Sequence, residues 1–130
     1  MRPIDDISRQ VIGLAIAIHR DLGPGLLESV YETVLEAALQ RAGLKVERQV
    51  PVDILFDGMQ FSGAFRLDLL VDDRLIVEIK SVERLSKAHA KQLLTYLRLT
   101  KQQVGLLLNF SEATMMKGVM RLVNDYRPEN

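Results

Sequence analysis

The part of the sequence that decides the fold reads FRLDLLV (residues 65–71), DDR (72–74) and LIVEIK (75–80). Two apolar runs of strand length flank a short polar segment, which predicts an antiparallel hairpin with a three-residue turn. In that register Asp68 lies directly opposite Glu78, with Cβ atoms roughly 5 Å apart. Lys80 then points to the same face as Glu78, and the opposite face carries four core-facing side chains: Leu67, Leu69, Val77 and Ile79.

Two carboxylates opposed across a sheet repel each other, so the pair needs a compensating cation or a raised pKa. A divalent metal is the simplest cation, because Mg²⁺ is held by one or two carboxylates and fills its other positions with water and phosphate oxygens. Lys80 would then lie beside the attacked phosphate or the nucleophilic water.

Two alternatives to this metal site stay open at the level of the residues. In the first, Asp68 and Glu78 are solvated charges on the wet face of a hairpin, with Lys80 neutralising Glu78, and the charge pattern alone favours this interpretation. In the second, a two-residue turn shifts the register and removes the direct pairing of the carboxylates.

The composition predicts one small domain with an aliphatic core. The chain has 130 residues, of which 48% are hydrophobic and 5% aromatic, and we expect a single domain over residues 1–130. The absence of cysteine excludes disulfides, thiolate zinc sites and cysteine nucleophiles. No N-terminal segment has the form of a signal peptide, and the apolar run at 11–18 is too short to cross a bilayer. We therefore expect a cytoplasmic protein without membrane contact.

The net charge of zero argues against a protein that coats nucleic acid electrostatically. The charge is unevenly spread, however, because residues 81–110 hold five Lys or Arg and one acidic residue. Within this segment the candidate contacts to phosphate are Arg84, Lys87, His89 and Lys91. The alternative is that the basic residues only solvate the outer face of a helix, which we expect for Arg98 and Lys101.

Hydrophobic periodicity and turn residues predict the remaining elements. We expect helices over 4–22 and 26–41, a strand over 45–56, a hairpin turn at Asp57-Gly58 and a returning strand from Met59. Pro51 should force the first of these strands to an edge or a bulge. A helix capped by Ser86 runs to about residue 100, a buried strand covers 104–109, and a short last element lies near 119–123.

Four segments in this order resemble a known group of enzymes. Asp68 and the later triplet Glu78-Ile79-Lys80 resemble the core signature of the PD-(D/E)XK nuclease superfamily, although Leu67 stands where the name of the signature has Pro. GLLESVY (25–31) matches the GxxExxY motif, which names a family of small bacterial proteins in that superfamily. HAKQLLTYL (89–97) and GLLLNF (105–110) resemble its later helix and strand. The resemblance implies an α/β fold with a restriction-endonuclease-like core, in which helices flank a mixed central β-sheet.

The resemblance also implies a function: a Mg²⁺- or Mn²⁺-dependent nuclease that hydrolyses phosphodiester bonds in DNA or RNA. The metal ligands would be Asp68, Glu78 and the backbone carbonyl of Ile79, with Glu28 reaching towards them from its helix. Lys80 would stabilise the developing charge or position the water.

The remaining motif residues have supporting roles under the same resemblance. Gln92 would orient the water or Lys80, and Tyr96 lies one helical turn later on the same side. Tyr31 would support Glu28, whereas Gly25 serves the backbone. For Glu28 the alternative is an exposed first-turn residue favoured by the helix dipole, and for Gln92 it is an ordinary boundary residue.

A second class of function stays open. The chain is then a non-catalytic module that binds nucleic acid or protein and only retains the nuclease-like fold. A domain of this size has little surface with which to bind a nucleic-acid duplex. We therefore also expect a homodimer, or a complex with a partner protein, to provide additional binding surface.

Overall fold

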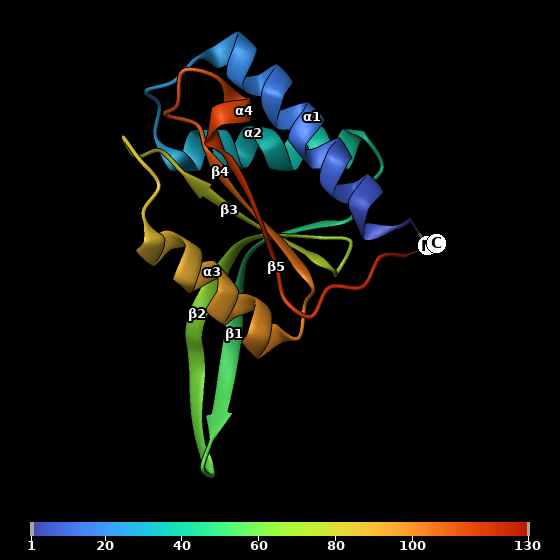
Figure 1. Ribbon diagram of the computed structural model, residues 1–130, viewed down its shortest axis with the longest axis vertical. Helices are drawn as coiled ribbons and strands as arrows, with labels where there is room; N and C mark the ends of the chain where they lie inside the picture. The colour runs from blue at the N-terminus through green and yellow to red at the C-terminus, as the bar shows by residue number, and fades with distance from the viewer. Residues whose placement is uncertain (1, 130) are drawn as a thin grey trace.

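The computed structural model describes residues 2–129 as a five-stranded sheet with helices packed against it (Figure 1). The strands lie side by side in the order of the sequence: β1 (Val46–Phe56), β2 (Met59–Val71), β3 (Leu75–Lys80), β4 (Val104–Asn109) and β5 (Val119–Val123). The helices are α1 (Ile4–Leu22), α2 (Glu28–Arg41), α3 (Lys87–Thr100) and α4 (Met115–Gly118). The predicted α/β fold with a mixed sheet is confirmed.

The β2–β3 hairpin has the register predicted from the sequence. Val71 pairs with Leu75, and the pairing continues through Leu70 and Ile76 to Leu69 and Val77. The turn comprises residues 72–74, and the alternative of a two-residue turn is wrong. The next strand, β4, runs parallel to β3, because α3 crosses over between them. The other neighbouring strands are antiparallel.

Helices cover both faces of the sheet. The larger core lies between one face and the helices α1 and α2. The helix α3 packs on the other face through Leu93 and Leu97. Glu78 follows Ile76 on this second face, and it is only 3% exposed. The alternative in which Glu78 is a solvated charge on a wet face is therefore wrong.

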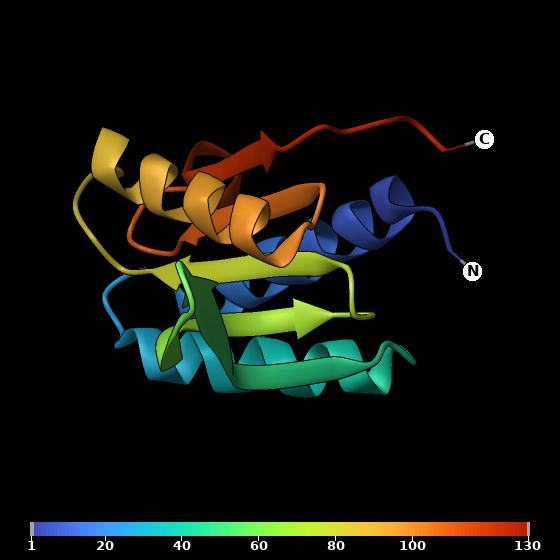
Figure 2. The same cartoon turned by 90° about the horizontal axis from the view of Figure 1, so that it is seen from below.

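The regular ladder between β2 and β3 ends at Leu69 and Val77, one residue before the two carboxylates. On the other side of β2, Gln49 of β1 lies opposite Asp68 with a left-handed φ of 53°, and it interrupts the β1–β2 ladder. The β1–β2 hairpin bends sharply here and leaves the plane of the sheet, as Figure 2 shows. Regular pairing with both neighbouring strands is therefore interrupted at Asp68.

This bend corrects one expectation. Strict alternation predicts that Leu67 shares a face with Leu69, but Leu67 packs in the cluster beneath α3. Leu69, Val77 and Ile79 lie in the core beneath α1 and α2, as predicted. The prediction for Leu67 is wrong, because the backbone bend at Asp68 reverses the alternation of side chains along β2.

The other elements lie close to their expected bounds. The strand with Pro51 is an edge strand, and both residues of the Asp57-Gly58 turn have positive φ. The helix α2 begins at Glu28 rather than residue 26, because Gly25 has a φ of 102° and the chain enters the helix in extended form. The four-residue α4 was not expected, since four residues carry no periodicity. Among residues 2–129 the helices are too short or too polar to span a bilayer.

Gly118 provides a test of the packing around α4. A Cβ at this position would lie 2.2 Å from the backbone carbonyl oxygen of Asn109, so the backbone would have to move. We expect Gly118→Ala to lower the free energy of unfolding by about 1–3 kcal/mol. Gly13 is the matched control, because its Cβ would meet nothing within 4 Å, and Gly13→Ala in a helix should stabilise by roughly 0.5–1 kcal/mol. Urea denaturation measures the free energy of unfolding of both variants. Equal changes in Gly118→Ala and Gly13→Ala would contradict the structure.

Candidate active site

Two crossed hydrogen bonds join β2 and β3 where the ladder ends. The backbone N–H of Asp68 donates to Glu78 Oε2 at 2.8 Å, and the backbone N–H of Ile79 donates to Asp68 Oδ2 at 2.8 Å. Each carboxylate thus replaces a backbone carbonyl as the acceptor for the opposite strand. The bonds fix both carboxylates and use one oxygen of each, so Asp68 Oδ1 and Glu78 Oε1 remain for a further ligand.

The two carboxylates share a strongly negative environment. Burial and then the charge of Asp68 raise the pKa of Glu78 to about 8, although the Asp68 N–H opposes the shift. Burial also raises the pKa of Asp68, against the hydrogen bond from Ile79. The charge of Lys80 favours the ionised form of both groups, but it does not cancel the increase in either pKa. A cation at this position would be stabilised by both carboxylates.

The helix α3 contributes Tyr96 and Gln92 to the same region. Tyr96 stacks on Phe65 of β2, with ring centroids 4.2 Å apart. Its pKa is raised by burial and by the charges of Glu78 and Asp68, which places its phenol near the carboxylates. Gln92 lies beside the Tyr96 hydroxyl and opposes this shift. Both α3 residues singled out in the sequence therefore belong to the site region.

Glu28 reaches the chain just beyond Lys80 rather than the carboxylate pair itself. Its Oε1 accepts a hydrogen bond from the backbone N–H of Ser81 at 3.1 Å, and the Ser81 hydroxyl donates to the carbonyl of Leu26. A cavity of about 580 Å³ opens beside this contact, lined by residues 25–29, Ser81 and Ser111. Glu28 thus fixes the end of β3, which carries Lys80, and it does so at the edge of this cavity.

The other residues of the GxxExxY motif shape the turn before Glu28. The fully buried Tyr31 donates its hydroxyl hydrogen to the carbonyl of Gly23 and accepts a hydrogen bond from the N–H of Leu26. Its ring stacks on Phe110, with centroids 4.3 Å apart. Gly25 has a φ of 102°, which L side chains rarely adopt. Gly25 and Tyr31 therefore position Glu28 by fixing the backbone.

The sequence did not single out a polar cluster next to the carboxylates. Glu32, which is 6% exposed, accepts a hydrogen bond from Gln49 Nε2 at 2.7 Å and lies 3.4 Å from Arg48 Nε. Its charge raises the pKa of both Asp68 and Glu78, so it faces them. The sequence feature that could have identified Glu32 is its position: it directly follows Tyr31 and lies one helical turn beyond Glu28.

Asn109 is a second residue that sequence reasoning missed. It is fully buried, and its amide both donates to the carbonyl of Val82 at 2.9 Å and accepts from the Val82 N–H at 3.1 Å. It therefore fixes the segment that follows Lys80. A polar residue at the end of the apolar run VGLLLN was the signal in the sequence.

The basic residues expected to contact phosphate lie before and in the first part of α3. Arg84, Lys87 and Lys91 are exposed, and none of the three is paired with an acidic residue of the described chain (2–129). His89 has a structural role, because its Nδ1 accepts a hydrogen bond from the Ser86 N–H in the capping box of α3.

The donor atoms fit a hard divalent cation. Carboxylate oxygens are the ligands that Mg²⁺ and Mn²⁺ prefer, and Mg²⁺ needs only one or two of them from the protein. Asp68 and Glu78 supply these oxygens. Within residues 2–129 no three His, Cys, Asp or Glu side chains gather closely enough to hold a metal without other ligands. The arrangement therefore fits a metal that is completed by water and substrate oxygens.

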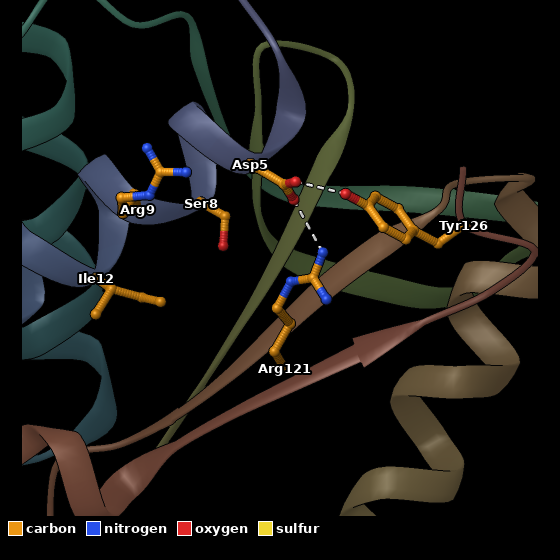
Figure 3. Close-up of a pocket in the computed structure, with 6 residues that line it drawn as sticks. All are labelled: Asp5, Ser8, Arg9, Ile12, Arg121 and Tyr126. Atoms are coloured by element: carbon orange, nitrogen blue, oxygen red, sulfur yellow. Dashed lines mark hydrogen bonds and ion pairs between the residues drawn. The ribbon is translucent and has the colours of Figure 1, made fainter. Parts of the chain in front are cut away.

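A different cavity, shown in Figure 3, is a structural feature rather than a second site. It measures about 410 Å³ and lies between α1 and the C-terminal segment. Asp5 accepts hydrogen bonds from Arg121 Nη2, at 2.9 Å, and from the Tyr126 hydroxyl. The bond from Tyr126 and the bond and charge of Arg121 stabilise the ionised carboxylate and lower its pKa. The cluster thus ties the chain end to α1.

Comparison with known proteins identifies a family and a similar fold. The family model described as the PD-(D/E)XK nuclease superfamily matches residues 5–122. The crystal structure of SSO0001 is similar, with a TM-score of 0.56 and 20% identity over 77% of this chain. The match covers 52% of SSO0001, so the chain spans about half of its length, and at this identity the likeness shows the fold alone. No curated protein matches the chain. The narrower GxxExxY family name stays a prediction.

The raised pKa of Glu78 predicts how the metal-free protein responds to pH. Its folded pKa of about 8 exceeds the ordinary value of 4.5, so the folded state binds this proton more tightly than the unfolded state. The associated stability is complete below pH 4.5 and is lost as the pH rises to 8, with a total of roughly 3–5 kcal/mol.

Glu78→Gln should remove this loss of stability at rising pH. The uncharged amide has no proton to lose, and its oxygen still accepts the hydrogen bond from the Asp68 N–H. In EDTA we expect the variant to melt higher than the wild type at pH 8, and the difference to vanish near pH 4.5. Glu47→Gln on exposed β1 is the control. An unchanged pH profile in Glu78→Gln would contradict the assignment of the loss to Glu78.

Proposed function

The chain belongs to the PD-(D/E)XK nuclease superfamily, and we propose that it is a divalent-metal-dependent nuclease that hydrolyses phosphodiester bonds in nucleic acid. The observation that carries this proposal is the crossed pair of Asp68 and Glu78, with the charge of Lys80 beside both carboxylates. Carboxylates that each leave one oxygen uncommitted, next to a lysine, are suited to phosphoryl chemistry.

Asp68 and Glu78 would hold Mg²⁺ or Mn²⁺ through these remaining oxygens, together with the backbone carbonyl of Ile79. When bound, the metal supplies a Lewis acid for the phosphoryl oxygen and lowers the pKa of a coordinated water. Glu28 would complete the acidic surroundings from the N-terminus of α2, where its carboxylate accepts from Ser81. Glu32 would add a further negative charge beside the pair.

Lys80 would stabilise negative charge that develops on the phosphate, or hold the attacking water. Its own position is fixed from both sides, because its carbonyl accepts from the Phe110 N–H and the next residue is held by Glu28. Gln92 and Tyr96 of α3 would orient the water or Lys80 by hydrogen bonds. Preorganised groups of this kind do not have to reorganise as the charge develops.

Substrate would approach over the exposed basic residues before and within α3. Arg84, Lys87 and Lys91 would contact phosphates flanking the scissile bond, and His89 would add a contact through Nε2, since its Nδ1 is used in the capping box of α3. Binding through so few phosphates would weaken steeply as salt is raised.

The first test of this function is metal binding, which needs no knowledge of the substrate. Calorimetric titration of Mn²⁺ should show binding to the wild type that is lost in Glu78→Gln, because the amide removes the charge and one anionic ligand. Glu47→Gln should bind as the wild type does. Cleavage of labelled single- and double-stranded DNA and RNA should then require Mn²⁺ or Mg²⁺ and fail in Glu78→Gln.

Nucleic-acid binding that survives EDTA and Asp68→Ala, without any turnover, would instead support the non-catalytic binding module. Metal-dependent cleavage that is unchanged in Glu78→Gln would sink the proposed site.

A substitution at Lys80 tests catalysis separately from metal binding. Lys80→Met should retain Mn²⁺ binding, since the lysine is not a ligand and its removal takes a positive charge away from the carboxylates. Cleavage should fall by about 10²–10³-fold, the usual effect of losing one preorganised electrostatic group. Lys45→Met, at the exposed residue just before β1, is the matched control, and a Lys80→Met variant as active as this control would exclude the catalytic role.

A further inference from the structure

Beyond the bend at Asp68, the β1–β2 hairpin projects away from the sheet as a two-stranded arm (Figures 1 and 2). We define the arm as residues 54–61, which comprise the strand ends and the Asp57-Gly58 turn. Large apolar side chains are exposed here, among them Leu55 at 74%, Phe56 at 69%, Met59 at 52% and Phe61 at 48%. An isolated two-stranded hairpin is marginally stable in water, so this composition indicates a surface that is covered in use.

The register places most of this apolar surface on one face of the arm. Ile54 pairs with Phe61, and Phe56 pairs with Met59. Directly paired residues share a face, and so do residues two apart along a strand. These four side chains therefore form one apolar face, whereas Leu55 and its partner Gln60 lie on the opposite face.

The charge of the arm favours a protein over nucleic acid or an anionic membrane. Residues 49–65 contain two Asp and no Lys, Arg or His. Phosphate groups would therefore meet Asp57 at the tip without any basic residue to neutralise them. Asp53 at the base already accepts a hydrogen bond from the Gly63 N–H and completes the hairpin.

The size of the apolar face matches a second copy of the same chain. At these exposures, Phe56, Met59 and Phe61 together leave on the order of 350 Å² of accessible surface per chain. Two such faces packed together would bury about 700 Å², and the backbone and side-chain atoms that flank them would bring the total towards roughly 1,000 Å², the size of a weak, transient interface. A contact between identical faces closes after two chains and leaves no surface for further growth.

We propose that the apolar face of the arm, formed by Ile54, Phe56, Met59 and Phe61, packs against the same face of a second copy to form a two-fold symmetric dimer. The proposal goes beyond the nuclease function and does not depend on it, because no residue of the arm belongs to the candidate site. Sheet faces pack at about 10 Å separation with interdigitated side chains, which this face provides.

Sedimentation velocity tests the proposal, with the two faces of the arm as an internal comparison. The wild type should be dimeric at about 100 µM, a concentration suited to an interface of this size. Phe56→Ser, and independently Phe61→Ser, should raise the dissociation constant by about tenfold or more. Leu55→Ser removes a more exposed side chain from the opposite face, and it should change the constant by less than about twofold. Circular dichroism and a thermal melt confirm that each variant is folded.

Three results would overturn the proposal. A wild type that is monomeric at this concentration shows that the arm does not join two copies. Equal weakening by Leu55→Ser and Phe56→Ser shows that the contact does not use the predicted face. A monomer in which Phe56→Ser weakens the binding of an oligonucleotide assigns the arm to substrate instead. None of these results would affect the metal-binding test at Glu78, which decides the proposed function separately.

Discussion

The structure depends on the exchange of two hydrogen bonds between carboxylates and backbone at the point where β2 and β3 separate. A regular antiparallel pair would join Asp68 and Glu78 through their backbones and leave both side chains repelling each other. Instead each carboxylate accepts the N–H of the opposite strand. The backbone hydrogen-bonding groups are thereby satisfied while the strands diverge. The charges remain close together, and under the proposed function this repulsion would be relieved by a bound cation.

The surrounding elements hold this arrangement from two sides. On β1, Gln49 takes a left-handed conformation opposite Asp68 and bonds Glu32 of α2, which supports the bend. At the end of β3, the chain after Lys80 is fixed by Glu28 and by Asn109. The motif residues Gly25 and Tyr31 act one step further away, because they set the turn from which Glu28 projects. A short helix–strand domain thus positions a lysine without disulfides or a large core.

Sequence reasoning could predict what depends on local periodicity and on turn chemistry. The polar turn at 72–74 sets the register of β2 and β3, and the apolar stripe over 4–22 predicts α1, since both signals lie within a few residues of the feature. The face of Leu67 could not be predicted, because the bend comes from a residue on another strand. Glu32 and Asn109 were missed for a similar reason: their partners lie 17 and 27 positions away. The metal-binding roles of Asp68 and Glu78 stay a prediction: the local pairing of two carboxylates suggested them, and the resemblance favoured them over solvated charges.

The bend couples the site to the arm. The strand that carries Asp68 also carries Phe65, which stacks almost parallel on Tyr96, at an interplanar angle of 3°. The charges of Glu78 and Asp68 help to raise the pKa of the Tyr96 phenol. The stacked rings of Phe65 and Tyr96 therefore connect the strand that leads into the arm with the polar groups beside the carboxylates. The acidic pair and the projecting hairpin are consequences of one local departure from regular strand pairing.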